Sequence, residues 1–465
     1  MISYFLWELV CMLTILALLM IIVFIVLLSK NKLSVFGALT IVPFVFGAIA
    51  TFVTGASFLD LFEWIKEGIL FSVDEETGKV STGVISPAIV ILFAVLYFGL
   101  MLNVGLFDPL CEFFIKKAKG DPLKVTMATV LTATVVTMNG DTTTTIIICV
   151  AAFLQLYKQM NIKLIYLAII IVTPIGIFNQ LPWGGPTIAA STAMGVSISE
   201  LFADLLPGMI VAEVFAIFMA YFIGIKERKR LNFDPKTAKD ISPEQMESML
   251  NAIRLKDPEL KRPKLYAFNL ILTLAILVML VMDVAHGGVL FGIGAAIALT
   301  VNYKSASLIN ERIDDLAADA LAPALATLAA GVFSGVLTGS GMSTALATSI
   351  TAIIPESLGT NMAPIYALIA APAITFLPQD AFYFGIAGVM SDVMGQYGIS
   401  ASEAAVASMV GQAFRLISPV IPALYMLVDS TETNFVNFQI KYVIYAWPII
   451  FIYLAVYTLT GALPI

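Results

Sequence analysis

The sequence predicts an all-α polytopic membrane protein made of two inverted repeats, each with a re-entrant hairpin and a broken helix. Of its 465 residues, 60% are hydrophobic and only 12% are charged, whereas about a quarter are charged in soluble proteins. The mean hydropathy is +0.96. The apolar residues form long runs, some of which are interrupted by polar residues or by glycine and proline. This composition excludes a cytosolic enzyme, a protein that binds nucleic acid and a disordered chain.

Eight apolar runs approach the length of about 20 residues that a helix needs to cross the hydrocarbon layer of a bilayer. They lie at about 4–28, 34–54, 83–105, 202–224, 265–283, 287–303, 316–338 and 441–461. The first run lacks the basic start and the small-residue cleavage site of a signal peptide. We therefore interpret it as a retained helix.

The positions of Lys and Arg predict the orientation of these helices, because basic residues stay on the cytoplasmic side. Eleven of the 25 basic residues lie between Lys226 and Lys264. We interpret 225–264 as a cytoplasmic linker that joins the first repeat, 1–224, to the second repeat, 265–465. The 55–82 loop carries six acidic residues and is expected outside. Both chain termini are then expected outside as well.

A polar tip interrupts one apolar segment of the first repeat, about 123–157. Lysines flank both of its ends, and each arm has only about 15 residues, which is short for a complete crossing. We therefore expect a hairpin that enters and leaves on the cytoplasmic side. Its tip has the sequence Asn139-Gly140-Asp141-Thr142-Thr143-Thr144.

The second repeat contains a corresponding segment, about 362–397, without basic flanks. Its tip includes Gln379 and Asp380, and Tyr383 follows. Counting spans from the linker places this hairpin on the outer face. Hairpins that enter from opposite faces are typical of inverted-topology repeats.

A helix broken by glycine or proline is expected after each hairpin, at about 164–198 and at about 402–428. Unwound backbone at membrane depth persists only where it lines a cavity or faces a ligand. The exposed N-termini of half-helices also attract anions. The two tips and two breaks therefore predict one site near the middle of the bilayer. The breaks contain Trp183-Gly184-Gly185-Pro186-Thr187 in the first repeat, and Gln412, Arg415 and Ser418 in the second.

The few charged side chains at these positions are candidates for function, because a charge inside a bilayer is costly. Arg415 has the geometry to contact a substrate carboxylate. Alternatively, Asp141 and Asp380 only cap the hairpin helices, and Arg415 pairs with Asp380 or Asp429. Glu213, in an otherwise apolar span, is expected either to bond to a neighbouring helix or to belong to a proton route.

Four motifs resemble the CitMHS family of bacterial citrate–divalent metal/proton symporters, which belongs to the ion transporter superfamily. The resemblance covers nearly the whole chain. The motifs are Gly140-Asp141 with the following threonines, Leu181-Pro182-Trp183-Gly184-Gly185-Pro186-Thr187, Asp380-Ala381-Phe382-Tyr383-Phe384-Gly385 and Leu416-Ile417-Ser418-Pro419. Arg415, Gln379 and Ala413 stand where the family usually has histidine, asparagine and proline.

The resemblance implies import of citrate as a complex with Mg²⁺ or Ca²⁺, coupled to protons, across the bacterial plasma membrane. No permanently bound cofactor is implied, since the metal is part of the transported complex. The family architecture is a homodimer in which a scaffold supports a transport domain that moves as an elevator. Charge favours the complex independently: free citrate carries about three negative charges and its divalent chelate about one. A site with one arginine and two aspartates suits the chelate better.

We therefore expect the chelate between the hairpin tips and the breaks, with Asp141 or Asp380 facing the metal or carrying the coupled proton. A sodium-coupled symporter of another di- or tricarboxylate is the alternative within transport. A membrane-embedded hydrolase is disfavoured, because the only histidine, His286, lies in an expected outer loop. The expected substrate-binding residues are Asn139, Gly140, Thr142, Thr143, Thr144, Trp183, Gly184, Gly185, Thr187, Gln379, Tyr383, Gln412, Arg415 and Ser418.

Overall fold

The computed structural model describes most of the chain, and within that part the protein is almost entirely helical. One short antiparallel pair, β1 (Phe71–Val73) and β2 (Val80–Thr82), is the exception among the described residues. The described residues are 2–30, 32–73, 80–118, 120–138, 140–234, 242–253, 258–282, 284–354, 356–359, 361–419 and 421–464.

In the first half of the chain, the described residues form ten α-helices. They are α1 (Ile2–Ser29), α2 (Val35–Thr54), α3 (Phe58–Ile69), α4 (Ile85–Val104), α5 (Asp108–Ala118), α6 (Pro122–Thr137), α7 (Thr142–Gln159), α8 (Leu164–Phe178), α9 (Gly185–Met194) and α10 (Ile198–Arg230). The expected hairpin range thus holds α6 and α7, and the expected broken helix holds α8 and α9.

The rest of the chain contains shorter pieces around its second hairpin and break. The helices are α11 (Pro243–Ile253), α12 (Tyr266–Val281), α13 (Gly287–Asn302), α14 (Ala306–Gly339), α15 (Met342–Thr351), α16 (Glu356–Gly359), α17 (Met362–Phe376), α18 (Gln379–Phe382), α19 (Gly388–Gly395), α20 (Ala401–Met409), α21 (Pro422–Ser430) and α22 (Phe435–Thr460). The described residues also include a π-helix, η4 (Tyr383–Ala387), and the 3₁₀ segments η2 (Pro258–Leu260), η3 (Pro263–Leu265) and η5 (Val410–Ile417).

Seven helices in the described residues are long and apolar enough to cross a membrane, and an eighth crossing results if α20, η5 and α21 are counted as one bent span. Seven of the eight expected runs correspond to these long helices. The run at 287–303 instead forms α13, which has 16 residues. Large apolar side chains are exposed on the outer helices, for example Phe222, Ile271 and Met282 at 64%, 67% and 69%. A multi-pass membrane protein accounts for such a surface.

Local signals explain where several helices begin. Asp121 precedes α6 and accepts a hydrogen bond from the backbone N–H of Leu123 at 3.1 Å, as an N-cap residue does. Pro122, Pro186 and Pro422 occupy the first turns of α6, α9 and α21. Proline fits there because the first N–H groups of a helix have no partner within it.

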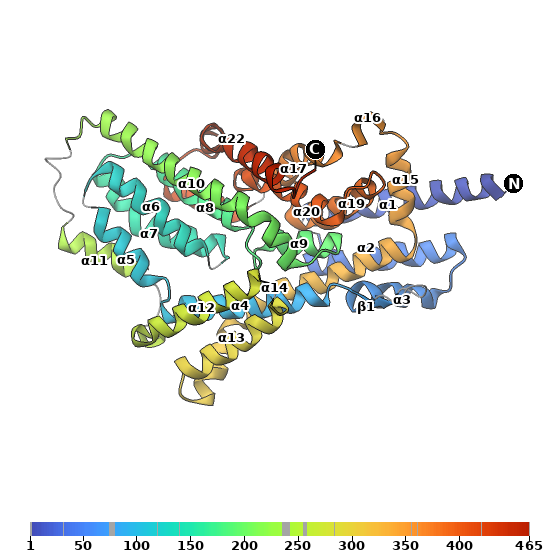
Figure 1. Ribbon diagram of the computed structural model, residues 1–465, viewed down its shortest axis with the longest axis horizontal. Helices are drawn as coiled ribbons and strands as arrows, with labels where there is room; N and C mark the ends of the chain where they lie inside the picture. Colours follow the sequence, from blue (N-terminus) through green and yellow to red (C-terminus); the bar gives the residue numbers. More distant parts are fainter. Residues whose placement is uncertain are drawn as a thin grey trace.

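The helices are arranged in two layers (Figure 1). The lower layer contains α2, α3, α4, α12, α13 and α14, and the upper layer contains α6 to α10 with α17, α19, α20 and α22. Within the lower layer, α14 packs against α2, α3 and α4, and α13 packs against α4. Glycines allow the close contact of α14 with α3, because a Cβ on Gly335 would lie 2.2 Å from the carbonyl oxygen of Trp64.

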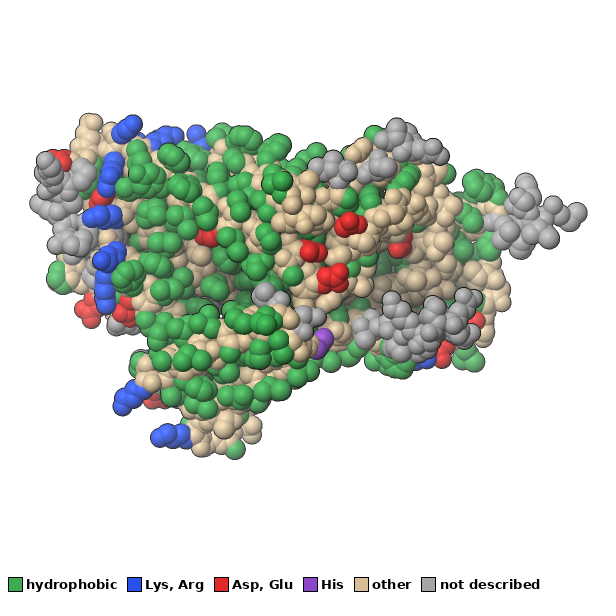
Figure 2. Space-filling view, viewed as in Figure 1, with side chains coloured by type: hydrophobic (Ala, Val, Ile, Leu, Met, Phe, Trp, Pro, Cys, Tyr) green, Lys and Arg blue, Asp and Glu red, His purple; other side chains and the backbone are tan. Residues whose placement is uncertain are grey.

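The segment expected to be a linker, 225–264, contains helical structure that packs on the rest of the protein. The α10 helix continues to Arg230, and α11 packs against α5 and α7. Glu227 anchors the end of α10 by accepting a hydrogen bond from the backbone N–H of Lys163 at 3.1 Å. Figure 2 shows Lys and Arg gathered at this end of the molecule, opposite to the N-terminus in Figure 1. The orientation of the termini stays a prediction.

Candidate functional site

The tip of the first hairpin lies between the end of α6 and the start of α7. Gly140 has a φ of +83°, and a Cβ there would lie 2.8 Å from Cδ1 of Trp183. Asp141 caps α7: its carboxylate accepts from the backbone N–H groups of Thr143 at 3.2 Å and Thr144 at 2.7 Å. The capping role considered for Asp141 is therefore present. Asn139 lies outside the described residues.

Trp183 connects this tip to both the first break and the lower layer. Its indole N–H donates a hydrogen bond to the carbonyl oxygen of Met138 at 3.0 Å. Its ring stacks on Phe98 of α4 with centroids 3.9 Å apart and meets Phe291 of α13 edge-on at 5.7 Å. Only 4% of Trp183 is exposed, so the ring packs between the hairpin and the lower layer.

The two glycines after Trp183 make different close contacts. A Cβ on Gly184 would lie 2.0 Å from the carbonyl oxygen of Asn179, so the tight turn requires glycine. A Cβ on Gly185 would lie 3.1 Å from Nε2 of Gln379, which places the second tip against the start of α9. Thr187, two residues after Gly185, is completely buried, and its hydroxyl has no hydrogen-bond partner among the described residues.

The second hairpin is held to the second break by Tyr383 and Gln412. Tyr383 begins the π-helix, a distortion that is frequent at functional sites. Its hydroxyl accepts a hydrogen bond from Nε2 of Gln412 at 2.9 Å and donates to the sulfur of Met409 at 3.1 Å. Both Tyr383 and Gln412 are completely buried, and Oε1 of Gln412 has no partner in the described part of the chain.

Arg415 binds the end of the first arm of the second hairpin. Its Nη1 donates to the carbonyl oxygens of Ile374 at 2.6 Å and Leu377 at 3.0 Å. A cation at a helix C-terminus also interacts favourably with the helix dipole. Among the described residues, Arg415 forms no close ion pair with Asp380 or Asp429, but the charges of Arg415 and Asp380 act on each other, so the alternative of a structural pair with Asp380 stays open.

These contacts bring both tips and both breaks into one cluster. Gly140 meets Trp183, Gly185 meets Gln379, and a Cβ on Gly176 of α8 would lie 3.6 Å from the carbonyl oxygen of Gln412. The remaining expected residues differ in exposure. Asp141 and Thr143 are exposed, Thr142, Thr144 and Asp380 are half-buried, and Ser418 is completely buried.

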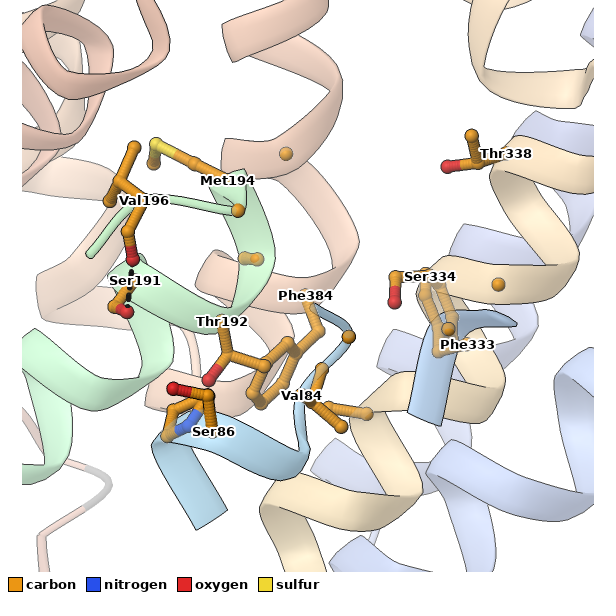
Figure 3. A pocket seen from close by; sticks show the side chains of 18 of the residues that line it. Val84, Ser86, Ser191, Thr192, Met194, Val196, Phe333, Ser334, Thr338 and Phe384 are labelled. Carbon is orange, nitrogen blue, oxygen red and sulfur yellow. Dashed lines mark hydrogen bonds between the residues drawn. The ribbon is translucent and has the colours of Figure 1, made fainter. Parts of the chain in front are cut away.

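A cavity of about 640 Å³ lies beside this cluster, between the two layers. It is lined by the Ser191–Ser199 segment, the first turns of α4, the second half of α14, and residues of η4 and α19. Figure 3 shows Thr192 and Phe384 on one side and Ser334 and Thr338 on α14 across from them. None of the expected site residues lines it.

The cavity wall is rich in hydroxyl groups. Thr192 is 7% exposed, and its hydroxyl has no partner among the described residues. Ser343 donates a hydrogen bond to the carboxylate of Asp392, and His286 bonds to Ser86 at 2.6 Å. Sequence reasoning missed this cavity, although the serines and threonines between Ser191 and Ser199 are a signal that could have indicated it.

No group of three or more His, Cys, Asp or Glu side chains that could hold a metal ion occurs in the described part of the chain. The cluster instead offers hydroxyls, amides, backbone N–H groups, one guanidinium and the carboxylates of Asp141 and Asp380. The guanidinium and the helix N-termini suit an anionic ligand, because both favour negative charge.

Comparison with known proteins identifies relatives over almost the whole chain. A family model described as citrate transporter, CitMHS, matches residues 2–411. A Bacillus subtilis (strain 168) protein named citrate transporter is 37% identical over 431 residues, which cover 92% of this chain and 94% of the relative. Another protein of that organism, named Mg(2+)/citrate complex secondary transporter, is 35% identical over 98% of this chain and 100% of its own.

The fold is similar to that of a solved transporter structure. The YdaH transporter of Alcanivorax borkumensis matches with a TM-score of 0.57 at 13% identity, over 90% of this chain and 98% of that chain. The long match to the family model and the relatives at 35–37% identity show the family. The chain therefore belongs to the citrate transporter family and is a membrane transporter rather than an enzyme.

Proposed function

We propose that this transporter imports citrate as a complex with Mg²⁺ or Ca²⁺ across a bacterial plasma membrane, coupled to protons. The relative named for Mg²⁺/citrate supports this substrate, since it is 35% identical over 98% of this chain. No resident cofactor is part of the proposal, because the metal enters with citrate.

The observation that carries the proposal is the convergence of both hairpin tips and both breaks through Gly140–Trp183, Gly185–Gln379 and Tyr383–Gln412. We place the chelate at this cluster. Nη1 of Arg415 is occupied by two carbonyls, whereas Nε and Nη2 have no acceptor among the described residues. These two donors suit one free carboxylate of the chelate. Asp380 supplies oxygens of the kind that Mg²⁺ and Ca²⁺ prefer.

An elevator movement of the upper layer against the lower layer is part of the proposal. The hydroxyl-lined cavity lies between the two layers and adjoins the cluster, which suits a vestibule on the outer side. Two inverted repeats are supported by two pairs of matching helix contacts. The contact of α4 with α13 matches the contact of α14 with α2, and the contact of α6 with α8 matches the contact of α17 with η5. The homodimer and outward-facing termini rest on the family resemblance and on the distribution of basic residues.

Uptake of labelled citrate into proteoliposomes tests the proposal. Mg²⁺, Ca²⁺ or a chelator should be combined separately with a pH gradient and with a Na⁺ gradient. We expect accumulation with a divalent ion and an inward proton gradient. Uptake driven only by Na⁺ and indifferent to divalent metal would instead support the sodium-coupled carboxylate symporter.

A further inference from the structure

Glu213 is a carboxylate buried in the middle of α10, and it faces the first arm of the first hairpin. Only 8% of the residue is exposed. Its Oε1 is hydrogen-bonded to the hydroxyl of Thr134 on α6, and α6 packs along α10. The expected bond to a neighbouring helix is therefore present.

The hydroxyl of Thr134 has only one hydrogen but two acceptors. Its Oγ1 lies 2.8 Å from the carbonyl oxygen of Val130 and also bonds to Oε1 of Glu213. When the hydrogen points to Val130, Thr134 can only accept from Glu213, so the carboxyl must carry the proton. When Glu213 is ionised, the hydrogen turns to the carboxylate. The pair therefore has one arrangement for each protonation state of Glu213.

The second oxygen of Glu213 has no compensating group in the described structure. Oε2 is buried and has no hydrogen-bond partner there. No Lys or Arg of the described residues forms an ion pair with Glu213. An ionised carboxylate in this position is costly, and a proton on Oε2 or Oε1 removes that cost.

An electrostatic interaction with Tyr453, and a hydrogen bond of Tyr453, relate this position to the first break. Gln180, directly after α8, donates from Nε2 to the hydroxyl of Tyr453 on α22 at 2.7 Å. Among the titratable groups on α6, α8, α9, α12, α20 and α22, which pack on α10, Tyr453 is the one on which the charge of Glu213 acts. Oε1 of Gln180 is also buried without a partner among the described residues.

We propose that Glu213 is the residue that takes up the coupled proton, and that Thr134 is its positioning residue. This inference rests on the proposed proton-coupled import. Asp141 is less suited to the task, because it is exposed and its carboxylate caps α7. Glu213 instead joins α10 to the arm that carries the first tip, so its protonation changes a contact within the upper layer.

The test compares Glu213→Gln with wild type in proteoliposomes, using two assays. In exchange, labelled Mg²⁺–citrate outside replaces unlabelled Mg²⁺–citrate inside without a gradient. In net uptake, a pH gradient of about one unit drives accumulation, which one coupled proton supports to about tenfold. We expect Glu213→Gln to keep exchange, because glutamine imitates the protonated side chain, and to lose the roughly tenfold accumulation.

Asp204→Asn is the matched control, since it changes a half-buried carboxylate of the same helix to its amide. It should keep both exchange and accumulation. Thr134→Val should keep exchange but shift the pH at which uptake is half-maximal, and Thr134→Ser should restore the wild-type pH profile. These variants retain a readout even if Glu213→Gln folds poorly.

The outcomes separate this inference from the proposed function. If wild-type uptake ignores the pH gradient, proton coupling itself is wrong. If wild type responds and Glu213→Gln accumulates Mg²⁺–citrate equally well, the assignment of Glu213 is overturned. An unchanged pH profile in Thr134→Val would likewise remove the positioning role.

Discussion

The indole N–H of Trp183 donates a hydrogen bond to the carbonyl oxygen of Met138, 3.0 Å away and 45 residues earlier in the chain. This bond joins the first break to the tip of the first hairpin. The same ring stacks on Phe98 of the lower layer. Trp183 thus lies where the hairpin, the broken helix and the lower layer meet.

Gly140→Ala should damage the tip of the first hairpin. The φ of +83° disfavours a side chain, and the new Cβ would lie 2.8 Å from Trp183. We expect a loss of about 1–3 kcal/mol of stability, seen as a lower melting temperature in detergent, together with weaker citrate uptake. Gly395→Ala is the control, because a Cβ there meets no atom within 4 Å. Equal behaviour of the two variants would contradict this prediction.

Arg415→Lys should raise the KM for Mg²⁺–citrate although it keeps the positive charge. A lysine cannot bind two carbonyls and also present further donors in a fixed plane. Loss of a charge-assisted hydrogen bond corresponds to about a tenfold higher KM. The measurement is the concentration dependence of uptake.

Arg262→Lys is the matched control for Arg415→Lys. Arg262 also binds backbone carbonyls, including that of Asn302 at 2.8 Å, but it lies at the start of the second half, among the lower-layer helices. We expect it to change stability and leave KM unaltered. An unchanged KM in Arg415→Lys would remove the substrate contact from the proposed function.

Ser334→Cys should be accessible to a membrane-impermeant thiol reagent added outside, because Ser334 is half-buried and lines the cavity. Mg²⁺–citrate should slow the labelling if the cavity is the outer vestibule. The background should carry Cys11→Ser, since Cys11 is exposed whereas Cys111 and Cys149 are buried. Ser408→Cys, at a completely buried position, should stay unlabelled. Labelling of Ser334→Cys only from the cytoplasmic side would reverse the proposed orientation.

Asp121→Asn should destabilise the start of the first arm of the first hairpin, mainly near neutral pH. Burial raises the pKa of Asp121. The hydrogen bonds that its carboxylate accepts from Arg228, with Nε 2.8 Å from Oδ1, and from the backbone N–H of Leu123 lower the pKa by more, so the net pKa lies below its ordinary value. Because the pKa is lowered in the folded protein, the ionised carboxylate stabilises the fold at pH values above its unfolded pKa of about 3.9. This stabilisation is lost as the pH falls through the folded pKa.

We expect Asp121→Asn to cost about 1–3 kcal/mol near pH 7 and clearly less at about pH 3.5. Thermal unfolding in detergent at the two pH values measures the difference. Asp60→Asn is the comparison, because that carboxylate accepts from the backbone N–H of Ser57. A penalty for Asp121→Asn that is the same at both pH values would contradict the ion-pair explanation.

Local patterns were sufficient for most of the helices and for the positions of the breaks. The spans follow from hydropathy, since the thickness of the bilayer sets the length of each apolar run. The tips and breaks follow from polar residues, glycine and proline, which end helices by their own chemistry. The α11 helix was missed because it is short and polar, and because α5 and α7, on which it packs, lie far away in the sequence.

The sequence by itself therefore determined a helical membrane protein of the citrate transporter family, with polar interruptions at Gly140, Trp183, Gln379 and Gln412. Only the tertiary structure decided which distant residues contact these positions. Arg415 binds the carbonyls of Ile374 and Leu377 rather than a carboxylate, and the cavity forms from segments as distant as Ser86, Thr192 and Ser334. The reason is physical: helix starts and spans depend on neighbouring residues, whereas hydrogen-bond partners and cavities depend on how distant helices pack.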